Sequence, residues 1–260
     1  MQGKYILDLK TVQSGNLRIL FEVLKEVLLS DINIIFTPTY IRVAEIDGSQ
    51  VALVHLTLES EAFESYYCER ELVLGINTNN FYKIIKTVSN NDTISFSVEA
   101  DNPSILRVKV ENSEKNKLFD SEVRLLDVPL FKLQIPDAIF PSVIILPSID
   151  FQKICRDLNS LGTEHTIEIE SVDQQLMFIY DGDFSKQKII LGKSDNTTFD
   201  KKSEYIVQGR FNLKFLLLFT KATNLCNTVQ IYLENDFPLI LEYSVGSLGK
   251  LRFILSNIVD

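Results

Sequence analysis

Two segments of the chain share the same pattern of apolar and polar positions. Apolar side chains recur at helical spacing from about Ser14 to Leu29 and again from about Ser148 to Leu161. The stripe consists of Leu17, Leu20, Phe21, Leu24, Val27 and Leu28 in the first segment and of Phe151, Ile154, Cys155, Leu158 and Leu161 in the second. This spacing predicts one amphipathic helix in each segment, with its apolar face in a core.

The chain also repeats itself at an offset of 134 residues, which relates the two stripes position by position. The same offset relates a second pair of predicted helices, Thr78–Val88 and Phe211–Thr223. Each of these follows a glycine, Gly75 or Gly209, and Phe81 corresponds to Phe215. Four segments in one register indicate a duplicated unit with two helices in each copy.

Between these helices, nearly every segment predicts a short β-strand. The segments are rich in branched and aromatic residues, and several alternate with period two, such as Ile94, Phe96 and Val98. The clearest are Val51–Leu58, Thr93–Glu99, Ile105–Glu111, Thr166–Ser171, Thr228–Glu234 and Leu239–Val245. Each half is therefore predicted to be a β-rich α+β domain whose two helices pack on one face of a curved antiparallel sheet.

The duplication predicts two domains, 1–125 and 141–260, joined by a connecting loop at 126–140. Pro129 and Pro136 disfavour a regular helix or strand in this loop. The loop is unusually apolar for a linker, with Val128, Leu130, Phe131, Leu133, Ile135 and Phe140. Two interpretations stay open: these side chains fold back onto the sheets, or they form a docking strip for a partner peptide.

Composition narrows the class of protein. Hydrophobic residues make up 45% and charged residues 23% of the 260 residues, as in a soluble globular protein. No apolar run is long enough for a membrane helix, and the first residues lack a secretory signal, so an intracellular protein is expected. Cys68, Cys155 and Cys226 contain no closely spaced pair, which disfavours a disulfide framework or a zinc site.

The net charge of −9 argues against a nucleic-acid partner until the charges are located. Eight basic residues lie on the polar sides of the four predicted helices: Arg18, Lys25, Lys83, Lys86, Lys153, Arg156, Lys214 and Lys221. The helices hold only four acids, which gives them +4, whereas the remaining 18 bases and 31 acids give −13. A single such helix is most simply a solvated face. Four of them in an acidic chain favour a polyanion bound through its phosphates.

Catalytic signatures are missing from the sequence. It has no phosphate-binding loop, no dinucleotide fingerprint, no HExxH and no GxSxG. His55 and His165 each fall in or beside a predicted strand, and Asp181-Gly182-Asp183 is first a turn signal. The sequence therefore predicts a protein that is not an enzyme and needs no metal or cofactor.

Several segments resemble the eukaryotic-type DNA sliding clamp, proliferating cell nuclear antigen. They are Val51–Glu59, Tyr67–Lys86 (YCERELVLGINTNNFYKIIK), Ile154–Leu158 (ICRDL), Phe219–Thr223 (FTKAT) and Phe237–Tyr243 (FPLILEY). The matching blocks occur in order along essentially the whole chain. The chain is also divergent and rich in Asn, Ile and Lys, which favours a viral or protist source.

The resemblance implies a homotrimeric ring of two-domain subunits that encircles double-stranded DNA without reading its sequence. Such a ring acts in DNA replication and repair in the nucleus, or in a cytoplasmic factory if it is viral, and it tethers DNA polymerase after a clamp loader has placed it. The eight basic residues would face the duplex. The strand around Lys117–Leu125 would pair with that around Lys186–Gly192 of the next subunit.

The resemblance also implies a pocket for partner peptides beside the connecting loop. Its residues would be Ile46, Val51, Leu53, Leu133, Ile135, Pro136, Phe140, Pro238 and Ile254. Three departures from the family pattern affect regulation and partner contacts. Ser171 stands near the family's modified lysine, Asn257 replaces a typical proline, and the chain stops at Asp260 without an acidic tail.

Other classes of protein stay open at this point. The nearest is one subunit of a heterotrimeric, checkpoint-type clamp with the same fold. A structural or adaptor β-protein without DNA contact is the alternative from another class, and an enzyme is a distant third.

Overall fold

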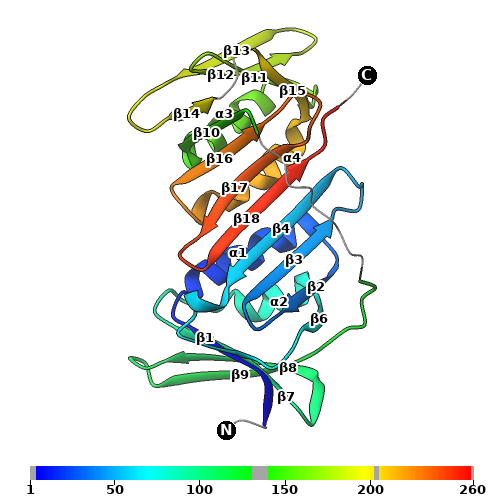
Figure 1. Ribbon diagram of the computed structural model, residues 1–260, viewed down its shortest axis with the longest axis vertical. Coiled ribbons are helices and arrows are strands. Elements are labelled where there is room, and N and C mark those ends of the chain that lie inside the picture. Colours follow the sequence, from blue (N-terminus) through cyan, green and yellow to red (C-terminus); the bar gives the residue numbers. More distant parts are fainter. Residues whose placement is uncertain (1–3, 131–139, 202–204, 259–260) are drawn as a thin grey trace. The chain divides into compact units, whose positions relative to one another are not determined.

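The computed structural model describes residues 4–130, 140–201 and 205–258, and the chain divides into two compact units (Figure 1). Unit 1 comprises 1–48, 54–133 and 244–251, and unit 2 comprises 49–53, 134–243 and 252–260. Each unit contains antiparallel sheet and two α-helices. The predicted duplicated α+β fold is therefore confirmed.

Unit 1 contains two antiparallel sheets and the helices α1 (Ser14–Leu28) and α2 (Thr78–Ile85). One sheet has the order β5-β1-β7-β8-β9, and the other contains β4-β3-β2-β6. The strands are β1 (Tyr5–Thr11), β2 (Asp31–Phe36), β3 (Tyr40–Ile46), β4 (Ala52–Glu59), β5 (Ser65–Cys68), β6 (Leu72–Asn77), β7 (Thr93–Glu99), β8 (Asn102–Asn112) and β9 (Lys117–Arg124). A short 3-10 helix, η1 (Ser60–Ala62), precedes β5.

Unit 2 repeats this plan with α3 (Ser148–Asn159), α4 (Leu213–Phe219) and the 3-10 helix η2 (Thr220–Asn224). One sheet has the order β13-β12-β11-β15, and the other contains β14-β10-β16-β17-β18. The strands are β10 (Ser142–Pro147), β11 (Thr166–Val172), β12 (Gln175–Asp181), β13 (Lys186–Gly192), β14 (Thr198–Lys201), β15 (Val207–Asn212), β16 (Thr228–Leu233), β17 (Leu239–Val245) and β18 (Gly249–Leu255).

The apolar stripes place each helix pair on its sheets, as their spacing predicts. In unit 1, Phe81 of α2 lies 4.6 Å from Phe21 of α1 and 6.0 Å from Phe96 of β7, measured between ring centroids. In unit 2, Phe151 of α3 packs on Phe178 of β12 at 6.1 Å. Aromatic contacts of this kind tie each helix pair to a sheet through buried area and ring geometry. The opposite side of each helix is left for polar residues.

The predicted bounds of α4 were wrong. Phe211 lies in β15, and the helix begins only after Asn212, whose side chain accepts a hydrogen bond from the backbone N–H of Lys214. Asn77 caps α2 in the same way, by accepting from Asn80. The two caps are 135 residues apart, one more than the offset of the glycines, so Phe81 corresponds to Leu216 and not to Phe215. Consistently, Phe81 and Leu216 are buried, whereas Phe215 is half-exposed.

A buried carboxylate with a partly exposed arginine partner in unit 2 supports a prediction about stability. Glu242 is 2% exposed and accepts a hydrogen bond at 2.6 Å from Nε of Arg252. Arg252→Met removes the guanidinium from this carboxylate and is expected to lower the free energy of unfolding by about 2 kcal/mol, because a buried carboxylate that loses its cationic partner is costly. Urea unfolding measures the effect. The double variant Glu242→Gln/Arg252→Met should lose less, and an equal or larger loss would contradict this explanation.

Candidate nucleic-acid interface and partner surfaces

The basic residues of α1 are not fully available to a ligand, because one of them contacts an acid and an aromatic ring in unit 1 and the other is half-buried. Lys25 Nζ lies 2.6 Å from a carboxylate oxygen of Glu26 and 4.9 Å above the ring of Tyr82. The hydrogen bond to Glu26 raises the pKa of Lys25, and burial together with Glu22 raises the pKa of Tyr82. Arg18, also on α1, is half-buried. These contacts hold the Lys25 side chain beside Tyr82 of α2.

The basic residues of α3 in unit 2 show the same partial neutralisation. Lys153 Nζ lies 2.7 Å from Asp157 Oδ2, one turn further along the helix, and this contact raises the pKa of Lys153. Both side chains are largely exposed, so the pair contributes little to stability. Arg156 is exposed on the same helix.

The other helix of each unit carries positive charge without a nearby acid. Lys83 lies in α2 and Lys86 at its C-cap, while Lys214 lies in α4 and Lys221 in η2. All four are exposed, and α2, α4 and η2 contain no acidic residue. Within the described residues none of the four forms an ion pair; Lys83 donates a hydrogen bond to Asn80. The strongest uncompensated positive charge is therefore on α2 and on α4–η2, which the residue count alone did not distinguish.

The predicted peptide pocket is only partly covered by the described residues. Leu133, Ile135 and Pro136 lie outside them, so their contribution stays a prediction. In unit 1, Ile46 is 43% exposed. In unit 2, Phe140 packs on Tyr232 at 5.7 Å between ring centroids. The other four pocket residues of that unit are at least partly exposed: Val51, Leu53, Pro238 and Ile254.

The start of the connecting loop is held by contacts that the sequence did not reveal. Leu126 N–H donates to Gly75 O at 2.9 Å, and the Asn33 side-chain amide donates to the carbonyls of Val128 and Pro129 at 3.2 Å each. A Cβ on Gly75 would lie 2.2 Å from the carbonyl oxygen of Leu126. Only a glycine admits this close approach. Asn33 is a polar residue within the apolar run of β2, and this was the one sequence feature that could have indicated the contact.

Two long strands end their sheets without a neighbour among the described residues. They are β9 in unit 1 and β13 in unit 2, with eight and seven residues. The opposite ends of these sheets differ. β5 has only four residues, and on β15 the backbone donors of Gln208 and Arg210 are taken by the side chains of Asn235 and Asn257. An uncovered edge strand is a template for pairing with another chain.

Within the described ranges, no group of His, Cys, Asp and Glu residues is arranged to hold a metal ion, and no helix is long and apolar enough to span a membrane. Burial raises the pKa of the Cys155 thiol far above its usual range. Asp181 is the last residue of β12 and pairs with Lys186 of β13 at 2.8 Å.

Two α+β units, each with a helix pair and basic side chains on it, define a duplicated clamp fold. The family models agree: the N-terminal domain of proliferating cell nuclear antigen matches residues 6–131 and its C-terminal domain matches residues 134–258. The chain is also 35% identical over 259 residues to a probable DNA polymerase sliding clamp 1 of Paramecium bursaria Chlorella virus 1, with 98% of both chains covered. The chain belongs to the proliferating cell nuclear antigen family.

Proposed function

We propose that this protein is a DNA polymerase processivity factor. It acts as a homotrimeric sliding clamp that encircles duplex DNA and tethers a polymerase and other replication and repair proteins. Its contribution is mechanical: a closed ring cannot leave the duplex sideways, so weak contacts suffice to keep a bound polymerase on its template. No catalytic step and no cofactor are part of this function.

The observation that carries the proposal is the positive charge of the helices in a chain of net charge −9. Lys83, Lys86, Lys214 and Lys221 are exposed and unpaired among the described residues, and they point to the phosphate backbone as ligand. Arg18, Lys25, Lys153 and Arg156 would add contacts to the same duplex. Backbone contacts of this kind are independent of base sequence and let a protein slide along DNA.

The partner surface is proposed to lie at the connecting loop, residues 126–140, between a domain formed by 1–125 and one formed by 141–260. The nine pocket residues predicted above would receive the short peptide of a polymerase or clamp loader, inserted as a helical turn. Support comes from the exposed apolar side chains Ile46 and Leu130, both 43% exposed. Ser171 is fully buried and shares a hydrogen bond of 2.8 Å with Ser142, so regulation by modification at this position is not proposed.

The solution mass separates this proposal from a heterotrimeric, checkpoint-type clamp. Light scattering over a dilution series should give about three times 29.7 kDa for the purified chain, because β9 and β13 are both present in each copy. A persistent mass of 29.7 kDa would contradict the self-assembling ring and favour missing partner subunits. Under the same proposal, the protein acts in the nucleus or in a cytoplasmic replication factory.

A further inference from the structure

The outward side chains of β9 form a short acidic pattern next to an apolar residue. Phe119, Ser121 and Val123 share the face of the buried β8 residues they oppose, so the alternate residues point to the outer face. The outer set begins with Leu118, which is 60% exposed, and continues with Asp120 and Glu122.

The outward side chains of β13 form the complementary pattern. Ile189 lies opposite the buried Phe178, so Lys186, Lys188 and Ile190 point to the outer face of their sheet. Ile190 is 53% exposed. Read from its end toward its start, β13 thus presents an apolar residue followed by two bases, whereas β9 presents an apolar residue followed by two acids.

In one antiparallel register between the two edges, each of these outward side chains lies opposite a complementary one. It sets the following residues opposite each other: Leu118 and Ile190, Asp120 and Lys188, Glu122 and Lys186. The same register sets Phe119 opposite Ile189 on the inner face. Opposite charges and apolar pairs in direct cross-strand contact are the stabilising unit of a sheet.

Other pairings fit less well. A shift of two residues in one direction places Leu118 opposite Lys188, and in the other direction Asp120 opposite Ile190. A parallel pairing matches the charges but places Ile190 opposite Arg124. The antiparallel register is therefore the one that both the charges and the apolar residues favour.

The pattern also opposes pairing of like edges. Two copies of β9 centred on Ser121 would bring Asp120 against Glu122, whereas two copies of β13 centred on Ile189 would set Lys188 opposite Ile190 and gain no ion pair. Like charges directly opposite are destabilising. The charges therefore favour a head-to-tail contact, which generates closed rings, over a two-fold dimer that would leave the other edges free.

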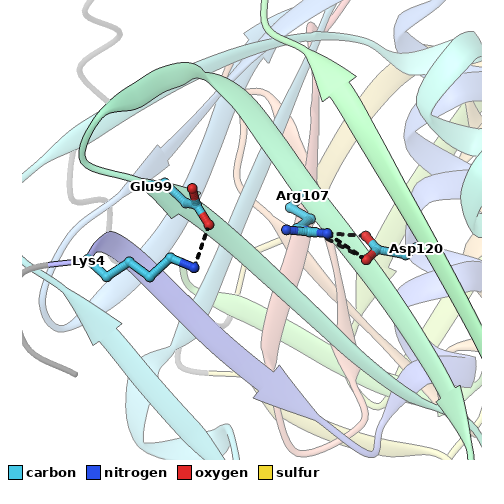
Figure 2. Close-up of polar contacts among 4 residues, drawn as sticks. All are labelled: Lys4, Glu99, Arg107 and Asp120. Atoms are coloured by element: carbon cyan, nitrogen blue, oxygen red, sulfur yellow. Dashed lines mark hydrogen bonds and ion pairs between the residues drawn. The ribbon is translucent and has the colours of Figure 1, made fainter.

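Ion pairs already present within the protomer extend this pattern. Figure 2 shows the guanidinium of Arg107 on β8 binding both carboxylate oxygens of Asp120, at 2.8 to 3.2 Å. This pairing lowers the pKa of Asp120 and keeps it ionised. On the other edge, Lys186 lies 2.8 Å from Asp181. Assembly would complete two three-membered rows of alternating charge, Arg107–Asp120–Lys188 and Glu122–Lys186–Asp181, and such networks are more effective than isolated surface pairs.

We infer that the acidic side chains of β9 and the basic side chains of β13 select a second copy of this chain as the partner of each edge. These complementary charges also set the register in which the two strands pair when the ring closes. The inference rests on the proposed ring and adds its register, its selectivity and its dependence on salt. Raising the ionic strength from about 0.05 to about 0.5 M is expected to loosen the ring, because screening weakens exposed charge pairs.

A charge swap tests the register. Glu122→Lys should weaken subunit association roughly tenfold per interface, because an attractive pair becomes repulsive. Glu122→Lys/Lys186→Glu should restore association, since the pair is rebuilt with reversed sign. Glu122→Lys/Lys188→Glu has the same composition change and should not restore it, because both rows then contain a like-charge contact. Sedimentation velocity measures the mass distribution, and circular dichroism confirms that each variant is folded.

The outcomes distinguish failure of the inferred charge pairing between β9 and β13 from failure of the proposed ring. If the unaltered chain stays monomeric at every ionic strength, the proposed ring is wrong. If the unaltered chain assembles and Glu122→Lys assembles equally well, the inference that the charges of β9 and β13 set the register is wrong. Rescue by Lys188→Glu in place of Lys186→Glu would overturn the inferred register, because both the parallel pairing and the antiparallel shift that sets Asp120 opposite Ile190 place Glu122 opposite Lys188. The control Glu69→Lys/Glu71→Lys changes exposed acids beyond β5, at the other end of the sheet, and should leave association unchanged.

Discussion

The double variant Leu118→Glu/Ile190→Glu is expected to be a folded protein that no longer assembles at micromolar concentration. In the inferred register these two side chains meet at every subunit interface, so each interface loses an apolar contact and gains two opposed carboxylates. Losing the burial of two half-exposed aliphatic side chains costs about 3 kcal/mol per interface, or roughly a hundredfold in the dissociation constant. Light scattering should report a mass near 29.7 kDa.

Exposure makes this variant a test of assembly rather than of folding. Leu118 and Ile190 are 60% and 53% exposed in the single chain, so the substitutions should change the free energy of unfolding of the protomer little. Val12→Glu/Ile206→Glu is the matched control, because these two apolar side chains are 52% and 50% exposed and lie on neither β9 nor β13. Both variants assembling normally would refute the role of the two edges.

Reversal of the four unpaired lysines should have the second large effect, on DNA binding. Lys83→Glu, Lys86→Glu, Lys214→Glu and Lys221→Glu together reverse twelve charges in a ring of three subunits. The affinity for duplex DNA at low salt is expected to fall at least about a hundredfold, and the salt dependence of binding should become much shallower, because fewer counterions are released. Primer extension by a clamp-dependent polymerase should lose its stimulation.

Pairwise variants locate the effect and control for net charge. Lys83→Glu/Lys86→Glu and Lys214→Glu/Lys221→Glu should each give an intermediate loss. Arg70→Glu/Lys250→Glu makes the same change in net charge at exposed positions outside the helices and should bind DNA nearly as well as the unaltered chain. An adaptor protein without DNA contact would show no difference among these variants.

Periodicity was sufficient to predict the duplicated fold from the sequence. The buried sides of α1 and α3 are the stripes at the 134-residue offset, and β7 and β17 have the predicted bounds. The bounds of α4 could not be read in the same way. Phe211, Leu213 and Leu216 are all apolar, so strand and helix overlap in pattern, and only the cap at Asn212 separates them.

The candidate site was only partly predictable, because sequence position gives charge but not pairing. Counting bases selected eight residues, yet it did not show that Lys25 and Lys153 face acids at 2.6 and 2.7 Å, whereas Lys214 has no ion pair with any described residue. The contact between Asn33 and the carbonyls of Val128 and Pro129 joins residues almost a hundred positions apart, and no local pattern reveals such a contact. The uncovered edges likewise depend on which strand ends a sheet.

Retention on end-capped DNA tests the central claim, that the protein holds DNA by encircling it. Duplex DNA is fixed to a bead at one end, the protein is allowed to thread over the free end at low salt, and a bulky protein cap is then bound there. The account predicts that a low-salt wash with excess free duplex, which takes up protein held only by phosphate contacts, leaves the protein on capped DNA and strips it from uncapped DNA. Equal retention, or equal loss, with and without the cap would contradict it.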